Sequence, residues 1–182
     1  AAHLEADEIR LLAKFDCSIA HCPSSNMKLG SGIAPIVAML EQGLRIGLGS
    51  DGAASNNRLD ISQEMRQSAL LAKAVSGNAA AVGAHDVLRM ATLNGAAALG
   101  LADKIGSIRT GKAADMCAVC LGTLEARPCY DPASHLVYAA GREHVSHVWV
   151  NGVLRVENGL LQGCDTSQLL DTVNLWQNKL TA

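Results

Sequence analysis

Aromatic residues and an excess of positive charge are both missing from this sequence. Phe, Trp and Tyr make up 3% of the 182 residues, and 15 Lys and Arg face 17 Asp and Glu, giving a net charge of -2. Proteins that bind nucleic acid usually carry a basic surface, and those that bind single strands stack the bases on aromatic rings. The composition therefore indicates that nucleic acid is not a partner.

Long apolar runs are also missing. A membrane-spanning helix needs about 20 consecutive apolar residues, and no run in the sequence approaches that length. The first ten residues, AAHLEADEIR, have neither the basic start nor the apolar middle of a signal peptide. We therefore expect a cytoplasmic protein with no membrane partner. With 49% hydrophobic residues, the chain is long enough for one domain with an apolar core.

The six cysteines are spread along the chain, without the dense spacing of a small disulfide-bonded protein. In a cytosolic protein of this size, reduced and mostly buried thiols are expected. Cys117 and Cys120 form a CxxC pair inside ADMCAVCL, a stretch typical of a strand. Because residues i and i+3 of a strand point to opposite faces, we expect neither a disulfide nor a shared metal there.

The predicted elements follow the order of an α/β protein. Patterning predicts helices at 5–14, 35–42, 60–75 and 86–99, and strands at 17–21 and 44–50. This alternation is typical of βα units with a parallel sheet. The first helix is expected to bury Ile9, Leu11, Leu12 and Phe15, and Gly95 is expected to interrupt the last. CPSSNMKLGSG, at 22–32, is predicted to be a loop.

Beyond about residue 105 the composition favours β-structure. Residues 106–121 are typical of two short strands around a Gly-Lys turn, and 131–140 predict a short helix. In VSHVWVNGVLRVENG, Asn151-Gly152 is the strongest short-range signal for a β-hairpin. The chain ends in an amphipathic helix that Asp165 or Thr166 would cap. We therefore divide the chain into 1–105 and 106–182.

One carboxylate stands at the end of a predicted strand, in LGSDGAASNN at 48–57. If the strand stays regular, Asp51 shares a face with Gly47 and Gly49, which would leave open space below it. In a barrel of parallel strands this face points inward, and active sites lie at the carboxyl ends of the strands. Asp51 could bind a cation there, or take a proton from a water that a cation acidifies. Since Asp-Gly is also a common turn pair, a purely structural role is the alternative.

The loop behind this carboxylate is polar and uncharged. Ser55, Asn56 and Asn57 offer hydrogen-bond donors and acceptors that suit a neutral polar ligand, and they equally suit a helix cap. Lys28, in the preceding loop, is expected to be solvated, although it could face a substrate.

Four segments together resemble the amidohydrolase superfamily, in its branch of chlorohydrolase-like deaminases, which includes 5-methylthioadenosine/S-adenosylhomocysteine deaminases. They are HCPSSNMKLGSGIAPIVAMLEQG, LGSDGAASNNRLDISQEMR, ATLNGAAALGLADKIGSIRTGKAADMCAV and VYAAGREHVSHVWVNGVLRVENG. The resemblance covers nearly the whole chain, and the ordered set is far more specific than any one segment.

The resemblance implies the C-terminal part of a (β/α)8 TIM-type barrel, followed by part of a small β-sandwich and a C-terminal helix. Residues 1–105 would hold strands seven and eight of the barrel, and 106–182 the sandwich segment. The barrel would carry one divalent metal, zinc or else iron. Asp51 would be a metal ligand that also shuttles the proton. His21 would lie on the rim of the site, where it could orient a loop or bind substrate with Ser55 and Asn56.

The departures from the family pattern concern the other metal ligands. The family has an HxH pair on its first strand and a His on its fifth, and neither has a counterpart here. His3 fits the second His of an AHCVHL-type segment, which is not the catalytic one. A whole barrel takes about 250 residues. We therefore expect this chain to be the C-terminal part of a longer amidohydrolase and to be inactive alone.

The function that the resemblance implies is hydrolytic deamination of an adenosine-derived nucleoside, a small-molecule substrate, by a homo-oligomeric enzyme. The alternatives are s-triazine dechlorination or deamination, and deamination of guanine or 8-oxoguanine. A further alternative, from another class, is a non-catalytic scaffold that keeps the fold for assembly only.

Overall fold

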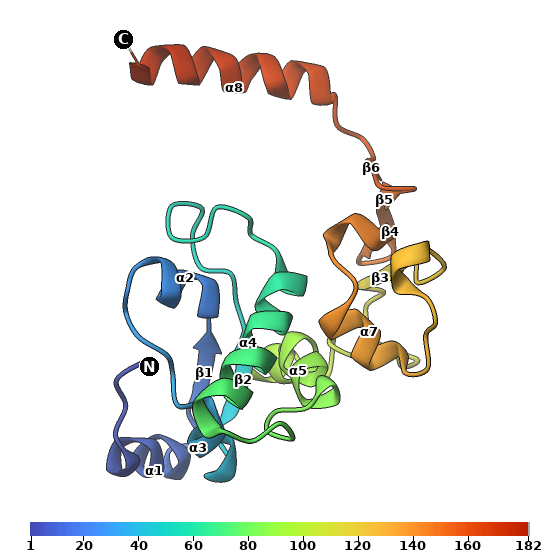
Figure 1. Cartoon of the computed structure of the whole chain (residues 1–182). Helices are drawn as coiled ribbons and strands as arrows, with labels where there is room; N and C mark the ends of the chain where they lie inside the picture. The colour runs from blue at the N-terminus through green and yellow to red at the C-terminus, as the bar shows by residue number, and fades with distance from the viewer. Residues whose placement is uncertain (182) are drawn as a thin grey trace.

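A computed structural model describes residues 1–181 of the chain (Figure 1). Helices and strands alternate in its first half, and strands dominate its second half until a final helix. The elements, in chain order, are α1 (Ala6–Lys14), β1 (Ser18–His21), α2 (Pro23–Lys28), α3 (Ile36–Glu41), β2 (Arg45–Leu48), α4 (Ile61–Ser76), α5 (Ala84–Ala91), α6 (Leu93–Ala98), β3 (Met116–Val119), η1 (Leu124–Ala126), α7 (Pro132–Tyr138), η2 (Arg142–His144), β4 (Val145–Val150), β5 (Val153–Glu157), β6 (Leu160–Leu161) and α8 (Thr166–Thr181).

The strands β1 and β2 lie side by side and run parallel, with Ile19 opposite Ile46 and His21 opposite Leu48. The carboxyl ends of both strands therefore lie at the same edge of the sheet, as the predicted βα units require. Parallel strands need a crossover connection, and α2 and α3 lie in the segment that joins them. The parallel α/β arrangement of this half is thus confirmed.

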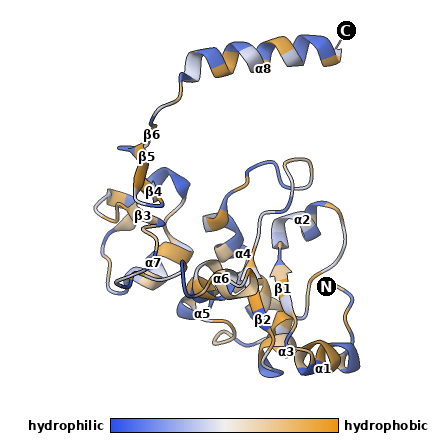
Figure 2. Cartoon of the chain, turned by 180° about the vertical axis from the view of Figure 1, so that it is seen from behind, coloured by the Kyte–Doolittle hydropathy of each residue, from blue (hydrophilic) through white to orange (hydrophobic). Residues whose placement is uncertain are grey.

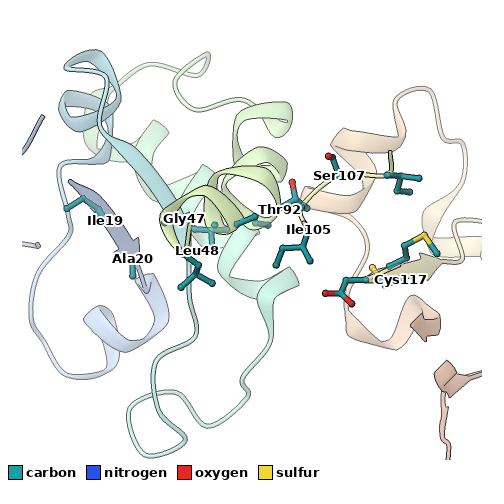
Figure 3. Close-up of a pocket in the computed structure, with 17 residues that line it drawn as sticks. Ile19, Ala20, Gly47, Leu48, Thr92, Ile105, Ser107 and Cys117 are labelled. Atoms are coloured by element: carbon teal, nitrogen blue, oxygen red, sulfur yellow. The ribbon is translucent and has the colours of Figure 1, made fainter. Parts of the chain in front are cut away.

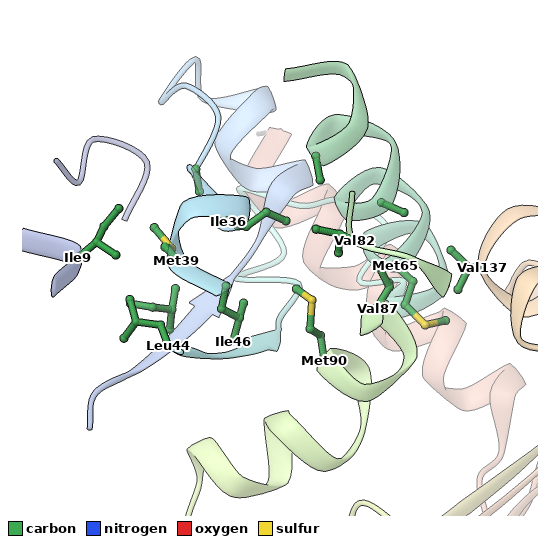
Figure 4. Packing of buried hydrophobic residues seen from close by; sticks show 14 residues of the cluster. Ile9, Ile36, Met39, Leu44, Ile46, Met65, Val82, Val87, Met90 and Val137 are labelled. Atoms are coloured by element: carbon green, nitrogen blue, oxygen red, sulfur yellow. The ribbon is translucent and has the colours of Figure 1, made fainter. Parts of the chain in front are cut away.

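The apolar core lies between these strands and the helices that follow them (Figure 4). Ile46 of β2, Met39 of α3 and Met90 of α5 are almost fully buried in one cluster. Val137 of α7 belongs to the same cluster, and α7 contacts α4 and α5. A helix from beyond residue 105 therefore helps to close the core of the preceding segment.

Four antiparallel strands, in the order β3-β4-β5-β6, form the second sheet. The hairpin between β4 and β5 turns at Asn151 and Gly152, which have φ values of 49° and 77°. Two consecutive positive φ angles are the signature of the type I′ turn that Asn-Gly favours, so this prediction is confirmed. The expected pair of strands in 106–121 is wrong, because within that stretch only Met116–Val119 forms a strand.

The helix predicted at 86–99 is broken at Thr92, whose φ of -126° and ψ of -97° are not helical, and not at Gly95. Gly95 lies inside α6, and a Cβ added to Gly47 of β2 would come within 2.9 Å of the Cα of Gly95. Glycine at both positions therefore lets α6 lie directly on β2. The predicted open space at Gly47 is wrong, since the backbone of a helix occupies it.

Two further predictions about the first 32 residues fail. Ile9 is buried as expected, but Leu11 and Phe15 are exposed, Phe15 to 70%. Leu11 is two positions from Ile9, about 200° around the helix, and so belongs to another face. The predicted loop at 22–32 contains α2, with Pro23 in the first turn, where its missing N–H has no consequence.

The cysteines are all free, as predicted, but none is fully buried, and Cys117, Cys120 and Cys164 are exposed. Cys120 lies just after the end of β3, and Cys117 lies within it.

The final helix, α8, stands away from the rest of the molecule (Figures 1 and 2). Asp165 caps it by accepting hydrogen bonds from the N–H groups of Ser167 and Gln168. Its apolar stripe consists of residues that are each more than half exposed: Leu169, Val173, Trp176 and Leu180. Among the helices within residues 1–181, none has the length and apolar character needed to cross a bilayer.

An exposed apolar stripe of this kind promotes association. We therefore expect the 182-residue chain to self-associate, and the double variant Leu169→Glu/Trp176→Glu to shift it towards monomer. Sedimentation velocity across a range of concentrations measures this. The matched control, Asn174→Glu/Gln177→Glu, adds the same two charges to the polar positions of α8 and should leave association unchanged. A wild-type chain that stays monomeric at all concentrations would contradict the expectation.

Candidate functional site

The segments that leave β1 and β2 meet at the shared edge of the two strands. The N–H of Gly49 donates to the carbonyl of His21 at 3.0 Å, one step beyond the last paired residues. Asp51 follows three residues after the end of β2 and is exposed. Its φ of 59° is in the left-handed region, which few residues adopt and Asp tolerates better than most. Asp51 therefore lies in the irregular segment between the end of β2 and the turn at 53–55.

The Asp51 carboxylate is held by two hydroxyls on one oxygen. Ser25 Oγ, from α2, donates to Asp51 Oδ2 at 2.6 Å, and Ser55 Oγ donates to the same atom at 2.7 Å. Hydrogen bonds to a carboxylate stabilise its charged form. Those from Ser25, Ser55 and the backbone of Gly52, in decreasing order, hold the pKa of Asp51 below its ordinary value. The carboxylate is thus ionised at neutral pH and held in one orientation.

The predicted alternation does not reach Asp51, because β2 ends at Leu48. A Cβ added to Gly49 would lie 3.1 Å from Cys22 Sγ, so a thiol occupies the space that was expected to be open. Burial, followed by the negative charges of Asp51 and Glu64, raises the pKa of the Cys22 thiol. Cys22 therefore stays protonated at neutral pH and is not an activated nucleophile.

The polar residues of the loop at 52–57 form hydrogen bonds with other residues of this chain. Ser55 contacts Asp51, as described, and Asn56 is buried with its Nδ2 donating to Glu64 Oε1 at 2.7 Å. Lys28 is exposed, as expected, and its Nζ donates to the carbonyl of Ala54 and to Asn57 Oδ1. The loop at 52–57 is therefore tied to α2 and to α4. The cap of α4 is Asp60, not one of the asparagines.

His21 lies at the end of β1, as predicted, but its side chain is buried and only 3% exposed, so it is not on an open rim. Burial lowers its pKa to about 4. The imidazole is therefore neutral at pH 7. Among residues 1–181, neither of its ring nitrogens has a hydrogen-bond partner.

Two residues of this network, Ser25 and Glu64, were missed by the sequence analysis. Ser25 was one of several polar residues in a predicted loop, and nothing in the sequence singled it out. Glu64 did leave a signal, since it stands beside Met65 and one turn before Ser68 on the buried face of an amphipathic helix. A glutamate is rarely fully buried without a partner.

The site has one carboxylate that could hold a cation. Both serine hydroxyls bind Oδ2 of Asp51, and no side-chain hydrogen bond to Oδ1 is found within residues 1–181. In the same range, no three His, Cys, Asp or Glu side chains come together as a metal cluster. The donor set fits a single metal ligand contributed by this chain, because ligating carboxylates are themselves hydrogen-bonded.

A separate cavity of ≈ 570 Å³ lies between the two strands, α6 and β3 (Figure 3). Ile19, Leu48, Ile105 and Cys117 are among its lining residues, and Asp51 is not. This largely apolar cavity is therefore distinct from the edge that carries the carboxylate.

The model of the amidohydrolase family matches residues 1–155. The chain belongs to this family. It is 43% identical over 177 residues to the 5-methylthioadenosine/S-adenosylhomocysteine deaminase of Teredinibacter turnerae, covering 97% of this chain and 40% of that protein. The enzyme of the same name from Moorella thermoacetica is also 43% identical, with 97% and 41% covered. The chain thus spans about two fifths of the length of these curated relatives.

Solved structures of the family share this fold. An adenosine deaminase from Xanthomonas campestris with bound zinc superposes with a TM-score of 0.96 at 43% identity, over 99% of this chain and 41% of that one. The atrazine chlorohydrolase of Arthrobacter aurescens TC1, complexed with zinc, gives a TM-score of 0.89 at 30% identity, over 96% and 39%. The predicted resemblance to the amidohydrolase superfamily and its deaminase branch is confirmed.

Removing the serine hydroxyls should raise the pKa of Asp51 towards its ordinary value, more in Ser25→Ala than in Ser55→Ala and most in the double variant. NMR titration of the Asp51 carboxyl carbon measures this in the 182-residue chain. Because the pKa is lowered in the folded state, this group stabilises the fold above the unfolded pKa, and that contribution is lost as pH falls through the folded pKa. An unchanged pKa in the double variant would show that the hydroxyls do not control the carboxylate.

Proposed function

We propose that this chain is the part of a metal-dependent hydrolytic deaminase that supplies a carboxylate to the active site, and that the substrate is an adenosine-derived nucleoside. The observation that carries the proposal is the Asp51 carboxylate, ionised and held by two hydroxyls at the carboxyl edge of parallel strands. The identity to 5-methylthioadenosine/S-adenosylhomocysteine deaminases supports this substrate class.

We further propose the architecture that the family resemblance implies. Residues 1–105 would contribute strands seven and eight to a (β/α)8 barrel, in which β1 and β2 are those strands. Residues 106–182 would contribute the antiparallel sheet and α8 to a β-sandwich segment and its C-terminal helix. The parallel pairing of β1 and β2 and the antiparallel second sheet are consistent with this division.

The divalent metal of the proposed enzyme is zinc, by analogy with the zinc-bound relatives, and iron is the alternative. Asp51 would provide one ligand from this chain through its carboxylate, and the remaining ligands would come from residues outside it. A bound metal of this kind acidifies a water molecule so that it becomes a nucleophile at neutral pH.

Asp51 would serve as the proton carrier of the reaction. Water adds to the ring carbon that bears the exocyclic amine, and Asp51 takes the proton that the water loses. It then gives that proton to the amine nitrogen, the carbon–nitrogen bond breaks, and ammonia leaves. Ser25 and Ser55 support this role because their hydrogen bonds to Oδ2 orient the carboxylate and keep it ionised.

A second candidate reaction is dechlorination or deamination of an s-triazine, which the similarity to the atrazine chlorohydrolase favours. The carboxylate would act in the same way, and the leaving group would differ. Release of ammonia from 5-methylthioadenosine or of chloride from atrazine separates the two candidates. Guanine and 8-oxoguanine belong in the same substrate panel.

A chimaera tests the proposal most directly. The chain replaces the matching 177 residues of the Teredinibacter turnerae deaminase, and ammonia release and bound zinc are measured. The chimaera should bind zinc and deaminate 5-methylthioadenosine, whereas the 182-residue chain alone should do neither, since three protein ligands are usual for catalytic zinc. Asp51→Asn should lower kcat of the chimaera by about 10²–10⁴-fold.

The control is Asp171→Asn on the exposed helix α8, which removes the same charge far from the site and should keep full activity. An active Asp51→Asn chimaera would refute the role of Asp51. An active, zinc-loaded 182-residue chain would show that the catalytic residues lie elsewhere in this sequence.

A further inference from the structure

A buried carboxylate without a cationic partner lies behind the Asp51 loop. Glu64, in the first turn of α4, is 0% exposed. Within residues 1–181, no Arg, Lys or His forms a salt bridge with it. Its hydrogen-bond donors are instead two amide groups, one of the backbone and one of a side chain. Burying an ionised carboxylate is costly unless hydrogen bonds compensate it, so the two contacts that Glu64 makes are the reason it can be tolerated there.

Each oxygen of Glu64 holds one of the two segments that meet at Asp51. Oε2 accepts a hydrogen bond from the backbone N–H of Ser24 at 3.0 Å, and Oε1 accepts one from Asn56 Nδ2 at 2.7 Å. Ser24 is the chain neighbour of Ser25, and Asn56 is the neighbour of Ser55. Glu64 therefore anchors the residue beside each serine that binds Asp51 Oδ2.

A second pair of contacts makes this anchor rigid. Asn56 Oδ1 accepts from the backbone N–H groups of Arg58 and Leu59, which fixes the plane of its amide. Ser24 Oγ donates to Gln67 Oε1, one turn further along α4. Both segments are thus fixed to one rigid element, the helix α4.

We propose that Glu64 is a positioning residue, which sets the orientation of the Asp51 carboxylate by holding Ser24 and Asn56, and through them Ser25 and Ser55. The effect of Glu64 on turnover rests on the proposed function. Its effect on the orientation of Asp51 does not depend on that function. Removal of a residue that orients a metal ligand typically costs about 10–100-fold in activity or metal affinity.

The donors and acceptors of this contact allow a swap test. In Glu64→Gln, the new NH2 group faces one of the two donors, the Ser24 N–H or the Asn56 amide, and that hydrogen bond is lost. In Asn56→Asp, the carboxylate at position 56 faces the carboxylate of Glu64. In the double variant Glu64→Gln/Asn56→Asp, the new amide at position 64 would donate to the new carboxylate at position 56, and its carbonyl oxygen would still accept from Ser24. The hydrogen bonds and the net charge are thereby restored. Each single variant should lose the fixed orientation of Asp51, and the double variant should regain it. Such non-additivity is expected of residues in contact.

The first readout is the side-chain rotamer of Asp51 in the 182-residue chain, measured by three-bond couplings to its Cγ. We expect one rotamer in the wild type and the double variant, and averaged couplings in each single variant. Unchanged couplings in both single variants would overturn the inference. This measurement involves neither metal nor turnover, so it decides about Glu64 even if the proposed deaminase activity fails.

The second readout is turnover by the chimaera. Each single variant should lower kcat by roughly 10- to 100-fold with a smaller change in KM, and the double variant should recover most of it. Glu41→Gln controls for the loss of a glutamate charge, because Glu41 is exposed and precedes the start of β2, at the end of the strand away from Asp51. Val87→Ala, a fully buried change in α5, controls for lost stability. A Glu64→Gln chimaera with wild-type kcat, or one slowed only as much as Val87→Ala, would refute the positioning role and leave the proposed function standing.

Discussion

Two hydroxyls on one carboxylate oxygen join the two segments on which the site of this protein depends. Ser25 comes from α2, which follows β1, and Ser55 from the loop after β2, and both donate to Asp51 Oδ2. The contact is possible because parallel strands end at the same edge, so that residues 26 positions apart in the chain become neighbours. This arrangement gives an ionised carboxylate whose Oδ2 accepts two hydroxyl hydrogen bonds, with no side-chain donor on Oδ1 within residues 1–181.

The support for this contact reaches into the body of the fold. The helix α4 carries Glu64, and the face that bears it also packs Met65, Ala69 and Ala72 into the core. On the other side, the glycine contact between Gly47 and Gly95 lets α6 lie on β2 without a side chain between them. The position of Asp51 therefore depends on the packing of α4 and on that of α6 against β2, and a change in either should alter the orientation of the carboxylate.

Local patterns predicted much of the fold, because their causes are local. The Asn151-Gly152 hairpin, the parallel βα order and the helix capped by Asp165 each follow from a few neighbouring residues. The family resemblance added Asp51, which no local pattern distinguishes from a turn. Some failures are local, such as the helix break at Thr92 and the helix α2 inside a predicted loop. Others involve distant segments: the hydrogen bond from Ser24 to Glu64 spans 40 residues, and the exposure of Phe15 depends on what packs against α1. Such contacts are set by tertiary structure and leave only weak traces in one sequence.

A crystal structure of the zinc-loaded chimaera tests the central claim that this chain contributes an oriented carboxylate to a metal site. We expect Asp51 Oδ1 to lie about 2.0–2.2 Å from the zinc, with Oδ2 still accepting hydrogen bonds from both Ser25 and Ser55. A zinc ion whose protein ligands do not include Asp51, or a ligating Asp51 that has released both serines, would contradict it.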